Sequence, residues 1–261
     1  MAFRSPSFDA VQEVSIGNVV LGRAPVKIIS SVCAATAEEM IEQAKAIEAS
    51  GADIIEWRAD YFADGTSWQE AVAAMKAVVT KPVIYTFRSQ SEGGVRTEPM
   101  SSTTWRKKVL AAIDSKLFDA VDIEFDRGRA EFLVEAARKA GIASVVSWHS
   151  FVPGEYDEEL GYFGKLEQMS YTGADVLKIV AMPDKGIDIA RFIEEVSVIR
   201  AEFNAPQPLI AMCMGKTGAV TRVGAAAFGT FASVVKSSAP GQLDVETTRK
   251  LLDLFAEDNA E

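Results

Sequence analysis

The sequence predicts a (β/α)8 barrel, and three observations lead to this prediction. About eight β-rich runs alternate with amphipathic stretches from residue 27 onward, at even spacing and without a linker. The length of 261 residues and the hydrophobic content of 48% suit one large core, so we expect a single domain over residues 1–261. An open doubly wound sheet usually has a glycine-rich first turn, and the stretch Ser30–Glu39 (SSVCAATAEE) contains no glycine.

The segment before the first barrel strand, about residues 1–24, is predicted to be an extension that contains a β-hairpin. In Val14–Leu21 (VSIGNVVL), a Gly-Asn turn separates two apolar runs. We expect this hairpin to close the floor of the barrel.

The barrel strands are expected where short runs are rich in β-branched and aromatic residues. These runs are Lys27–Cys33, Ala52–Arg58, Val83–Arg88, Ala120–Phe125, Ala143–His149, Asp175–Met182, Pro208–Met214 and Ser233–Ser237. Helical periodicity predicts helices that include Thr36–Glu48, Thr104–Ser115, Arg129–Lys139, Ile187–Phe203 and Val245–Glu257. Gly51 is expected to cap the first of these helices at its C-terminal end.

Charge and composition exclude several classes of partner. The net charge is −10 and no cluster of Lys or Arg is present, which argues against a nucleic-acid partner. An anionic ligand would need a local basic pocket, because the overall field repels it. No stretch approaches the roughly 18 apolar residues of a membrane span, and residues 1–14 lack the apolar segment of a signal peptide. We therefore predict a soluble, cytoplasmic protein with no membrane partner.

The cysteines and the histidine limit the metal chemistry. Cys33 and Cys213 lie far apart in apolar runs, so reduced thiols are expected and no disulfide framework. One histidine, His149, and two cysteines cannot assemble a usual zinc site, although a magnesium site made of carboxylates stays open at this point.

Polar residues share one face of several predicted strands, because strand side chains alternate with period two. The residues that share this face are Glu56 and Arg58, Asp122 and Glu124, Ser147 and His149, and Lys178. The opposite faces of the fourth and sixth predicted strands are wholly apolar, as contact with a layer of helices requires. The polar set is therefore expected to point into the barrel at its C-terminal mouth, where such folds carry their chemistry.

Lys178 and His149 belong to neighbouring predicted strands and are the candidate catalytic pair. A buried ammonium is costly unless it is paired or neutralised, so Lys178 is either a nucleophilic amine or a structural partner of Glu124 or Glu56. An amine that condenses with a ketone forms an iminium, and a nearby imidazole can then remove the proton from the adjacent carbon. This chemistry supports dehydration next to a carbonyl, and it equally supports a class I aldolase.

The ordered motifs of the chain resemble the type I 3-dehydroquinate dehydratases, which are Schiff-base enzymes of the shikimate pathway. The resemblance extends from about residue 14 to 257. It rests on Glu56–Tyr61 (EWRADY), Tyr85–Gly94 (YTFRSQSEGG), Ser147–Phe151 (SWHSF), Leu177–Pro183 (LKIVAMP), Ala211–Gly229 (AMCMGKTGAVTRVGAAAFG) and Ser237–Gln242 (SSAPGQ). The last two motifs resemble strand-to-helix loops of the family.

The resemblance implies a role for each matching residue. Lys178 would form the imine, and His149 would abstract the C2 proton of 3-dehydroquinate and protonate the departing C1 hydroxyl. Glu92 is the first candidate for tuning His149, and Glu124 is the second. The residues implied in substrate binding are Arg222, which would hold the substrate carboxylate, Ser31, Glu56, Arg58 and Arg88, and Ser238 and Gln242 on a closing loop. The resemblance also implies a homodimer, with no metal and no cofactor.

Two further interpretations differ from this one in kind. Another Schiff-base barrel of the class I aldolase type, or a catalytically silent ligand-binding barrel, would fit the same strand pattern. Nucleotide binding is rejected, because a phosphate loop that ends in Gly215–Thr217 (GKT) would require glycine at position 210, where the chain has Ile210.

Overall fold

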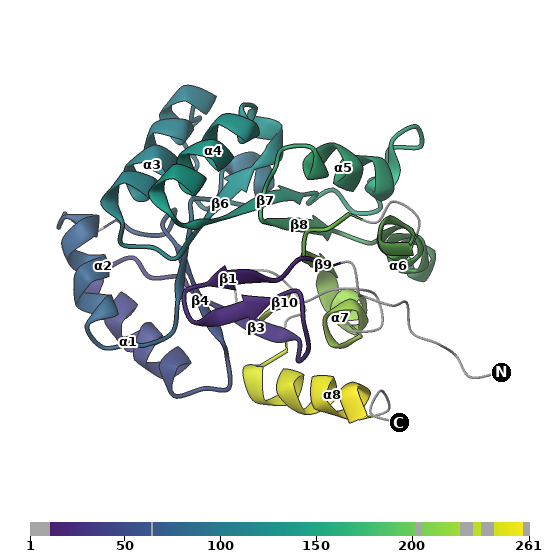
Figure 1. The fold of residues 1–261 in the computed structure, drawn as a ribbon, viewed down its shortest axis with the longest axis horizontal. Coiled ribbons are helices and arrows are strands. Elements are labelled where there is room, and N and C mark those ends of the chain that lie inside the picture. Colours follow the sequence, from purple (N-terminus) through teal and green to yellow (C-terminus); the bar gives the residue numbers. More distant parts are fainter. Residues whose placement is uncertain (1–10, 64, 202–204, 225–231, 236–242, 258–261) are drawn as a thin grey trace.

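The computed structural model describes residues 11–63, 65–201, 205–224, 232–235 and 243–257. A ring of parallel strands lies inside a layer of helices (Figure 1). The strands are β3 (Lys27–Val32), β4 (Ile54–Arg58), β5 (Val83–Thr86), β6 (Ala120–Glu124), β7 (Ala143–His149), β8 (Val176–Ala181), β9 (Leu209–Cys213) and β10 (Ala232–Val235). Their order is β10-β3-β4-β5-β6-β7-β8-β9, and the end strands β9 and β10 also lie beside each other. The predicted (β/α)8 barrel is therefore confirmed.

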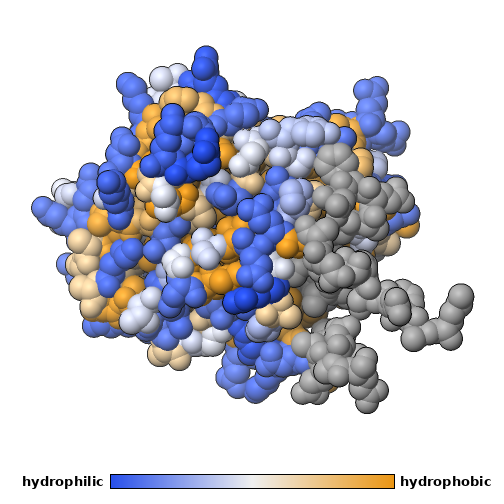
Figure 2. All heavy atoms as spheres, viewed as in Figure 1, coloured by the Kyte–Doolittle hydropathy of each residue, from blue (hydrophilic) through white to orange (hydrophobic). Residues whose placement is uncertain are grey.

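One helix follows each barrel strand. The helices are α1 (Ala37–Glu48), α2 (Trp68–Lys76), α3 (Ser102–Ser115), α4 (Ala130–Ala140), α5 (Gly161–Ser170), α6 (Gly186–Ala201), α7 (Gly215–Val223) and α8 (Val245–Glu257). On the face drawn in Figure 2, hydrophilic side chains cover much of the outside of the α3–α4 region. Within the described ranges, no helix combines the length and the apolar character that crossing a bilayer requires.

The N-terminal hairpin is present and its apolar side closes one end of the barrel. Strand β1 (Val14–Ile16) pairs antiparallel with β2 (Val19–Leu21) across the predicted Gly-Asn turn, where Gly17 has a φ of +56°. Ile16 and Leu21 are fully buried. They belong to one apolar cluster with residues near the N-terminal ends of the barrel strands, among them Ile54, Ala143 and Val176. The hairpin therefore seals the floor of the barrel.

A second and larger apolar cluster fills the space between the strands and the helices. It contains the outward-facing strand residues, such as Trp57 on β4 and Ile179 on β8, together with the inner faces of the helices. Because the strand period is two, the same strands present their other face to the interior of the barrel.

The C-terminal end of α1 differs from the prediction. The helix ends at Glu48, and Ala49 is its C-cap residue in the right-handed region. The hydroxyl of Ser50 donates to the carbonyl of Ile47 at 2.7 Å, and the backbone N–H of Ser50 also donates to this carbonyl at 3.0 Å. Gly51 as the cap was therefore wrong, because Ser50 supplies the bonds that a left-handed glycine would otherwise provide.

Candidate active site

The polar residues of the inner strand face lie together at the C-terminal ends of the strands, and nearly all are buried. Each of the following is at most 7% exposed: Ser31, Glu56, Arg58, Thr86, Arg88, Asp122, Glu124, Ser147 and Lys178. The side chain of His149 is 9% exposed. Buried charges require partners, and these side chains are one another's partners.

Lys178 lies on β8, where it is in register with Ser147 on β7. Its Nζ is 3.1 Å from Oε1 of Glu56 on β4 and 3.6 Å from Oδ2 of Asp122 on β6. Burial alone would raise the pKa of Glu56, but the charges of Lys178 and Arg58 and the hydroxyl of Ser31 outweigh it and hold this pKa well below its usual range. Glu56 is therefore an anion that faces the lysine amine across the barrel.

Two hydroxyl groups fix the orientation of the Glu56 carboxylate. Ser31 Oγ donates to Oε2 at 2.6 Å, and Thr86 Oγ1 donates to Oε1 at 3.0 Å. The oxygen that faces Lys178 is therefore already hydrogen-bonded from a second direction, so the carboxylate has little freedom to rotate.

Arg88 connects the acidic groups of this wall. Its NH2 donates to Asp122 Oδ2 at 2.8 Å, and its NH1 donates to Ser147 Oγ at 2.9 Å. NH1 also lies 3.4 Å from carboxylate oxygens of both Glu92 and Glu124. Burial opposes the charge of this guanidinium, but the surrounding carboxylates more than compensate and raise the pKa of Arg88. Arg88 therefore remains a cation inside the barrel.

His149 contacts Glu92, the first of the two carboxylates proposed to tune it. Its Nδ1 lies 2.9 Å from Glu92 Oε2. Burial, reinforced by the charges of Arg88 and Lys178, holds the pKa of His149 well below its usual range. Burial and the nearby Glu124 charge raise the pKa of Glu92, although Arg88 opposes them. The shift of His149 favours the neutral imidazole, which is the form that can accept a proton, and a positive charge on the imidazole would in turn favour the ionised form of Glu92.

Glu124, the second candidate, has other partners. Its Oε1 accepts the backbone N–H of Ser89 at 2.7 Å, and its Oε2 lies 3.4 Å from Nε of Arg127. It therefore holds the start of the loop that carries Glu92, and it acts on the Glu92 pKa from a distance.

The glycines of the Ser91–Gly94 stretch place Glu92 against His149. Gly93 has a φ of +83°, and the Phe151 ring occupies the space that a side chain at this position would need. A Cβ at Gly94 would lie only 2.0 Å from the carbonyl oxygen of Arg88. The loop therefore folds back on the end of β5, and only glycine fits at these two positions.

Arg58 forms a bidentate pair with Asp60. Its Nε and NH2 each lie 2.8 Å from a carboxylate oxygen of Asp60, which is fully buried. The same carboxylate lies 3.4 Å from the backbone nitrogen of Arg88 and 3.3 Å from that of Val95. In this structure, Arg58 therefore orders the wall of the site through its pair with Asp60.

Arg222 lies on α7 and is 2% exposed. Its NH1 is 2.8 Å from Sδ of Met212 on β9. Burial lowers the pKa of Arg222 to about 10. A cation in such a position gains from an anionic ligand, because the ligand would replace hydration that the guanidinium has lost.

The interpretation of Ala211–Gly229 as a strand-to-helix loop is corrected by the structure in its described part. β9 ends at Cys213, Met214 is the N-cap residue, and α7 begins at Gly215 without a connecting loop. A Cβ at Gly218 would lie 2.7 Å from the carbonyl oxygen of Cys213, so glycine permits this close contact between helix and strand.

Two predicted site residues could not be placed, and several residues without a predicted role belong to the site. Ser238 and Gln242 lie outside the described residues. Asp122, Ser147 and Thr86 join the network although no role was predicted for them, and the period-two pattern had placed Asp122 and Ser147 on the inner face. Asp60 carried no signal beyond its place in the EWRADY stretch.

Among the described residues, no three His, Cys, Asp or Glu side chains are arranged as metal ligands.

Comparison with known proteins gives a consistent result. The family model of the Type I 3-dehydroquinase matches residues 28–259. A 3-dehydroquinate dehydratase from Salmonella agona (strain SL483) is 34% identical over 254 residues, which cover 94% of this chain and 99% of that protein.

Solved structures agree. The type I 3-dehydroquinate dehydratase of Clostridium difficile, solved with covalently modified comenic acid, has a TM-score of 0.87 at 26% identity and covers 95% of this chain and 99% of its own. The 3-dehydroquinate dehydratase of Geobacillus kaustophilus HTA426 has a TM-score of 0.86 at 25% identity, with coverages of 94% and 97%. The family model covers most of this chain and the relatives cover nearly all of it, and the chain belongs to the Type I 3-dehydroquinase family.

Proposed function

We propose that this chain dehydrates 3-dehydroquinate to 3-dehydroshikimate, a step of the shikimate pathway, through a Schiff base on Lys178. The observation that carries the mechanism is the Lys178 amine, which is buried on the inner strand face 3.1 Å from Glu56 in a member of this family. A lysine amine buried inside the barrel can meet the carbonyl group of a bound substrate, and burial favours the uncharged, nucleophilic form of an amine.

The reaction begins with the attack of the neutral Lys178 amine on the C3 carbonyl of the substrate. The new C–N bond forms as the carbonyl oxygen leaves as water, which gives an iminium. The ammonium form of Lys178 first releases a proton to solvent, because Glu56 beside it has a pKa well below its usual range and is a weak base, and a proton taken back from solvent leaves with the carbonyl oxygen. The iminium then makes the C2 proton acidic, because it can accept the electron pair left by that proton.

His149 acts next as base and then as acid. Its neutral imidazole takes the C2 proton, the C1–O bond breaks, and the imidazolium returns the proton to the departing hydroxyl as water. Glu92, 2.9 Å from Nδ1, stabilises the positive charge on His149 while this proton is held. Water then hydrolyses the product imine and frees Lys178, so that one water molecule is released overall.

The remaining predicted residues bind and orient the ring. Arg222 supplies the local positive site that a carboxylate needs in a chain of net charge −10. Ser31 and Arg88 face the same interior, and each already orders a carboxylate there. Ser238 and Gln242 are proposed to close over the substrate and exclude water from the imine. The family resemblance further supports a homodimer in the cytoplasm, and sedimentation velocity would measure the mass of the assembly.

Borohydride trapping tests the mechanism. Reduction in the presence of 3-dehydroquinate should leave an adduct on Lys178, with the mass of the substrate or of its dehydrated form. Lys185→Ala, on the exposed surface, is the matched control and should retain the adduct. His149→Ala should still form the imine and accumulate it, because its defect lies in proton transfer. Normal turnover by this variant would contradict the role of His149.

Two results would favour another function. Adducts that form only with sugar phosphates would indicate a class I aldolase. A protein that binds 3-dehydroquinate but gives no increase in the enone absorbance of the product would be a silent ligand-binding barrel.

A further inference from the structure

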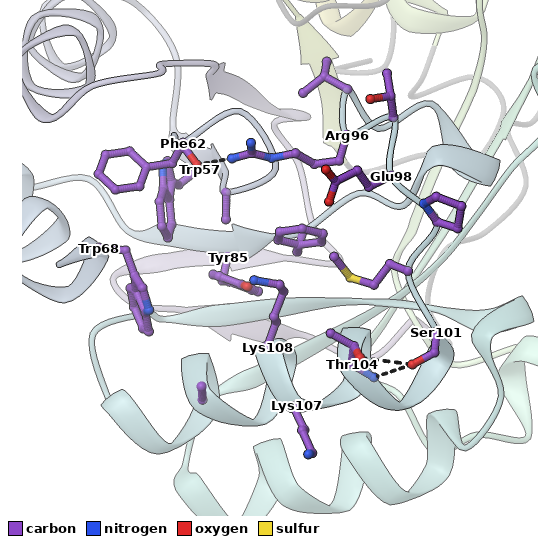
Figure 3. Close-up of a pocket in the computed structure, with 17 residues that line it drawn as sticks. Trp57, Phe62, Trp68, Tyr85, Arg96, Glu98, Ser101, Thr104, Lys107 and Lys108 are labelled. Atoms are coloured by element: carbon purple, nitrogen blue, oxygen red, sulfur yellow. Dashed lines mark hydrogen bonds between the residues drawn. The ribbon is translucent and has the colours of Figure 1, made fainter. Parts of the chain in front are cut away.

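A second cavity lies outside the barrel, between α2 and α3 over the outer face of β4 and β5 (Figure 3). Its volume is about 820 Å³, which is within the range of small-molecule sites. The segment 95–101 forms its roof. Nothing in the proposed reaction uses this space, because the reacting groups point to the opposite face of the same strands.

One wall of the cavity is aromatic. It contains Trp57, Trp68 and Tyr85, and the ring centroids of Trp57 and Trp68 are 6.0 Å apart at an interplanar angle of 28°. Phe62 and Phe87 border the same space. Flat rings in offset or edge contact with such a wall gain more than an aliphatic group of similar area.

One polar group of this wall is buried without a hydrogen-bond partner among the described residues. Trp57 is 1% exposed, and its indole Nε1 is buried without an acceptor. By contrast, the indole N–H of Trp105 donates to the Phe87 carbonyl at 2.9 Å, and that of Trp148 donates to Asp126 at 2.9 Å. A buried donor without an acceptor is costly, so an acceptor on a ligand would remove that cost.

The rim of the cavity is positive in a chain whose net charge is −10. Three basic residues, Arg96, Lys107 and Lys108, line it, and Glu98 is the one acidic residue in the lining. Lys107 and Lys108 are exposed and form no salt bridge with a described residue, although Lys108 Nζ lies 5.0 Å from the centre of the Phe87 ring. Arg96 donates to the carbonyl of Phe62, which joins the roof to the segment after β4.

We propose that this cavity binds a small aromatic carboxylate that carries a hydrogen-bond acceptor on its ring. The ring lies against the aromatic wall, the ring substituent accepts from Trp57 or Tyr85, and the carboxylate lies at the rim near Lys108, which points toward this wall (Figure 3). The occupant would also contact the segment that continues directly from the Glu92 loop, because Val95 is anchored to Asp60 beside it.

A fluorescence titration with 6-hydroxy-2-naphthoate tests the proposal, with the neutral 6-hydroxy-2-naphthamide as the matched ligand. The acid should bind at one site per chain, and the amide should bind several-fold more weakly. Ala111→Trp, at an exposed position of α3 that lines the cavity, should abolish binding by filling the space. The double variant Lys107→Gln/Lys108→Gln should weaken binding by roughly 2- to 20-fold, because exposed ion pairs contribute modestly.

Two control variants separate this site from the barrel and from general charge effects. Lys45→Gln removes an exposed lysine of α1 outside the cavity and should bind the acid normally. Arg222→Gln should also bind normally, whether or not it turns over 3-dehydroquinate, because Arg222 lies against Met212 of β9 and does not line the cavity. Circular dichroism and the kcat of Ala111→Trp should match those of the unchanged protein, which shows that the fold is intact.

Four results would overturn the proposal. Binding that survives Ala111→Trp would place the ligand elsewhere, and binding lost in Arg222→Gln would place it in the barrel. Equal affinity for the acid and the amide would remove the role of the basic rim. A change of oligomeric state in Ala111→Trp would mean that a second copy of the chain covers the cavity.

Discussion

The two ends of the barrel interior differ sharply although the same strands build both. On β4, Ile54 belongs to the apolar floor, and Glu56, two positions later on the same face, belongs to the charged layer. On β8, Val176 and Lys178 have the same relation. Two strand residues span about 6.6 Å, so on these two strands the inner face changes from apolar to ionic within one side-chain step. On β8 the next inward residue, Val180, is apolar again. The charges above this floor face apolar side chains on that side and therefore require protein partners.

Within the charged layer, substitution of Lys178 should have the largest effect on activity. We expect Lys178→Met to lower kcat on the order of 10⁵-fold or more, because the covalent route disappears. Methionine keeps most of the side-chain volume but leaves Glu56 and Asp122 without their shared cation, so stability should also fall by roughly 3–5 kcal/mol. Enone absorbance and urea unfolding measure the two effects. A variant with 1% or more of the normal activity would contradict an obligatory imine.

The apolar floor should show the reverse pattern at Leu21, which is fully buried in the hairpin. Leu21→Ala is expected to lower the free energy of unfolding by about 2–5 kcal/mol and to leave kcat unchanged. Val20→Ala, at a half-buried position of the same strand, is the matched control and should cost less. If Leu21→Ala reduced kcat in proportion to stability, the two ends would not be independent.

Within the charged layer, the Glu92–His149 pair should affect turnover more than binding. Glu92→Gln is expected to lower kcat by roughly 100-fold with little change in KM, because the amide cannot stabilise an imidazolium as a carboxylate does. Ser91→Ala, at the exposed neighbouring position, serves as the control and should remain active. A change confined to KM would mean that Glu92 contacts the substrate instead.

The pH dependence of stability should show the smallest of these effects, and it arises from the titration of His149. The low pKa of His149 leaves the imidazole neutral in the folded chain, whereas the unfolded chain binds a proton there below about pH 6.5. The contribution of neutral His149 to stability is therefore complete above pH 6.5 and is lost as the pH falls. The free energy of unfolding should decrease by at most about 1.4 kcal/mol per pH unit for this reason. His149→Asn should lack this slope between pH 6.5 and 5.5 in urea unfolding. Parallel curves for the two proteins would show that His149 is protonated in the folded state.

The period-two pattern was the most informative part of the sequence. It placed Asp122 and Ser147 on the inner face, where they are observed, on strands that the β-rich runs had predicted, and the predicted bounds of β7, Ala143–His149, agree with the observed ones. The strand pattern works here because each barrel strand has one face toward the helices and one toward the interior.

Contacts that depend on loops and on distant partners could not be derived in the same way. Glu92 lies in the short 3-10 turn Gln90–Glu92, 57 positions before His149, and only the family resemblance connected them. The partner of Arg58 is Asp60, two residues later, where the strand pattern has already ended. Helix α7 was missed as a continuous element because its glycines at 215 and 218 are poor helix formers, and contact with β9 outweighs that preference.

The close contact at Gly218 has a consequence for recognition. Because α7 begins directly after β9 and lies against it, Arg222 is held by the framework of the barrel and not by a long connecting segment. Immobilising a long side chain such as arginine costs up to about 2 kcal/mol of conformational entropy. Here that entropy is lost when the chain folds, so binding of an anion to Arg222 carries little further entropy cost for this side chain. Replacing Gly218 by a larger residue would therefore weaken anion affinity through disorder, without removing any charge.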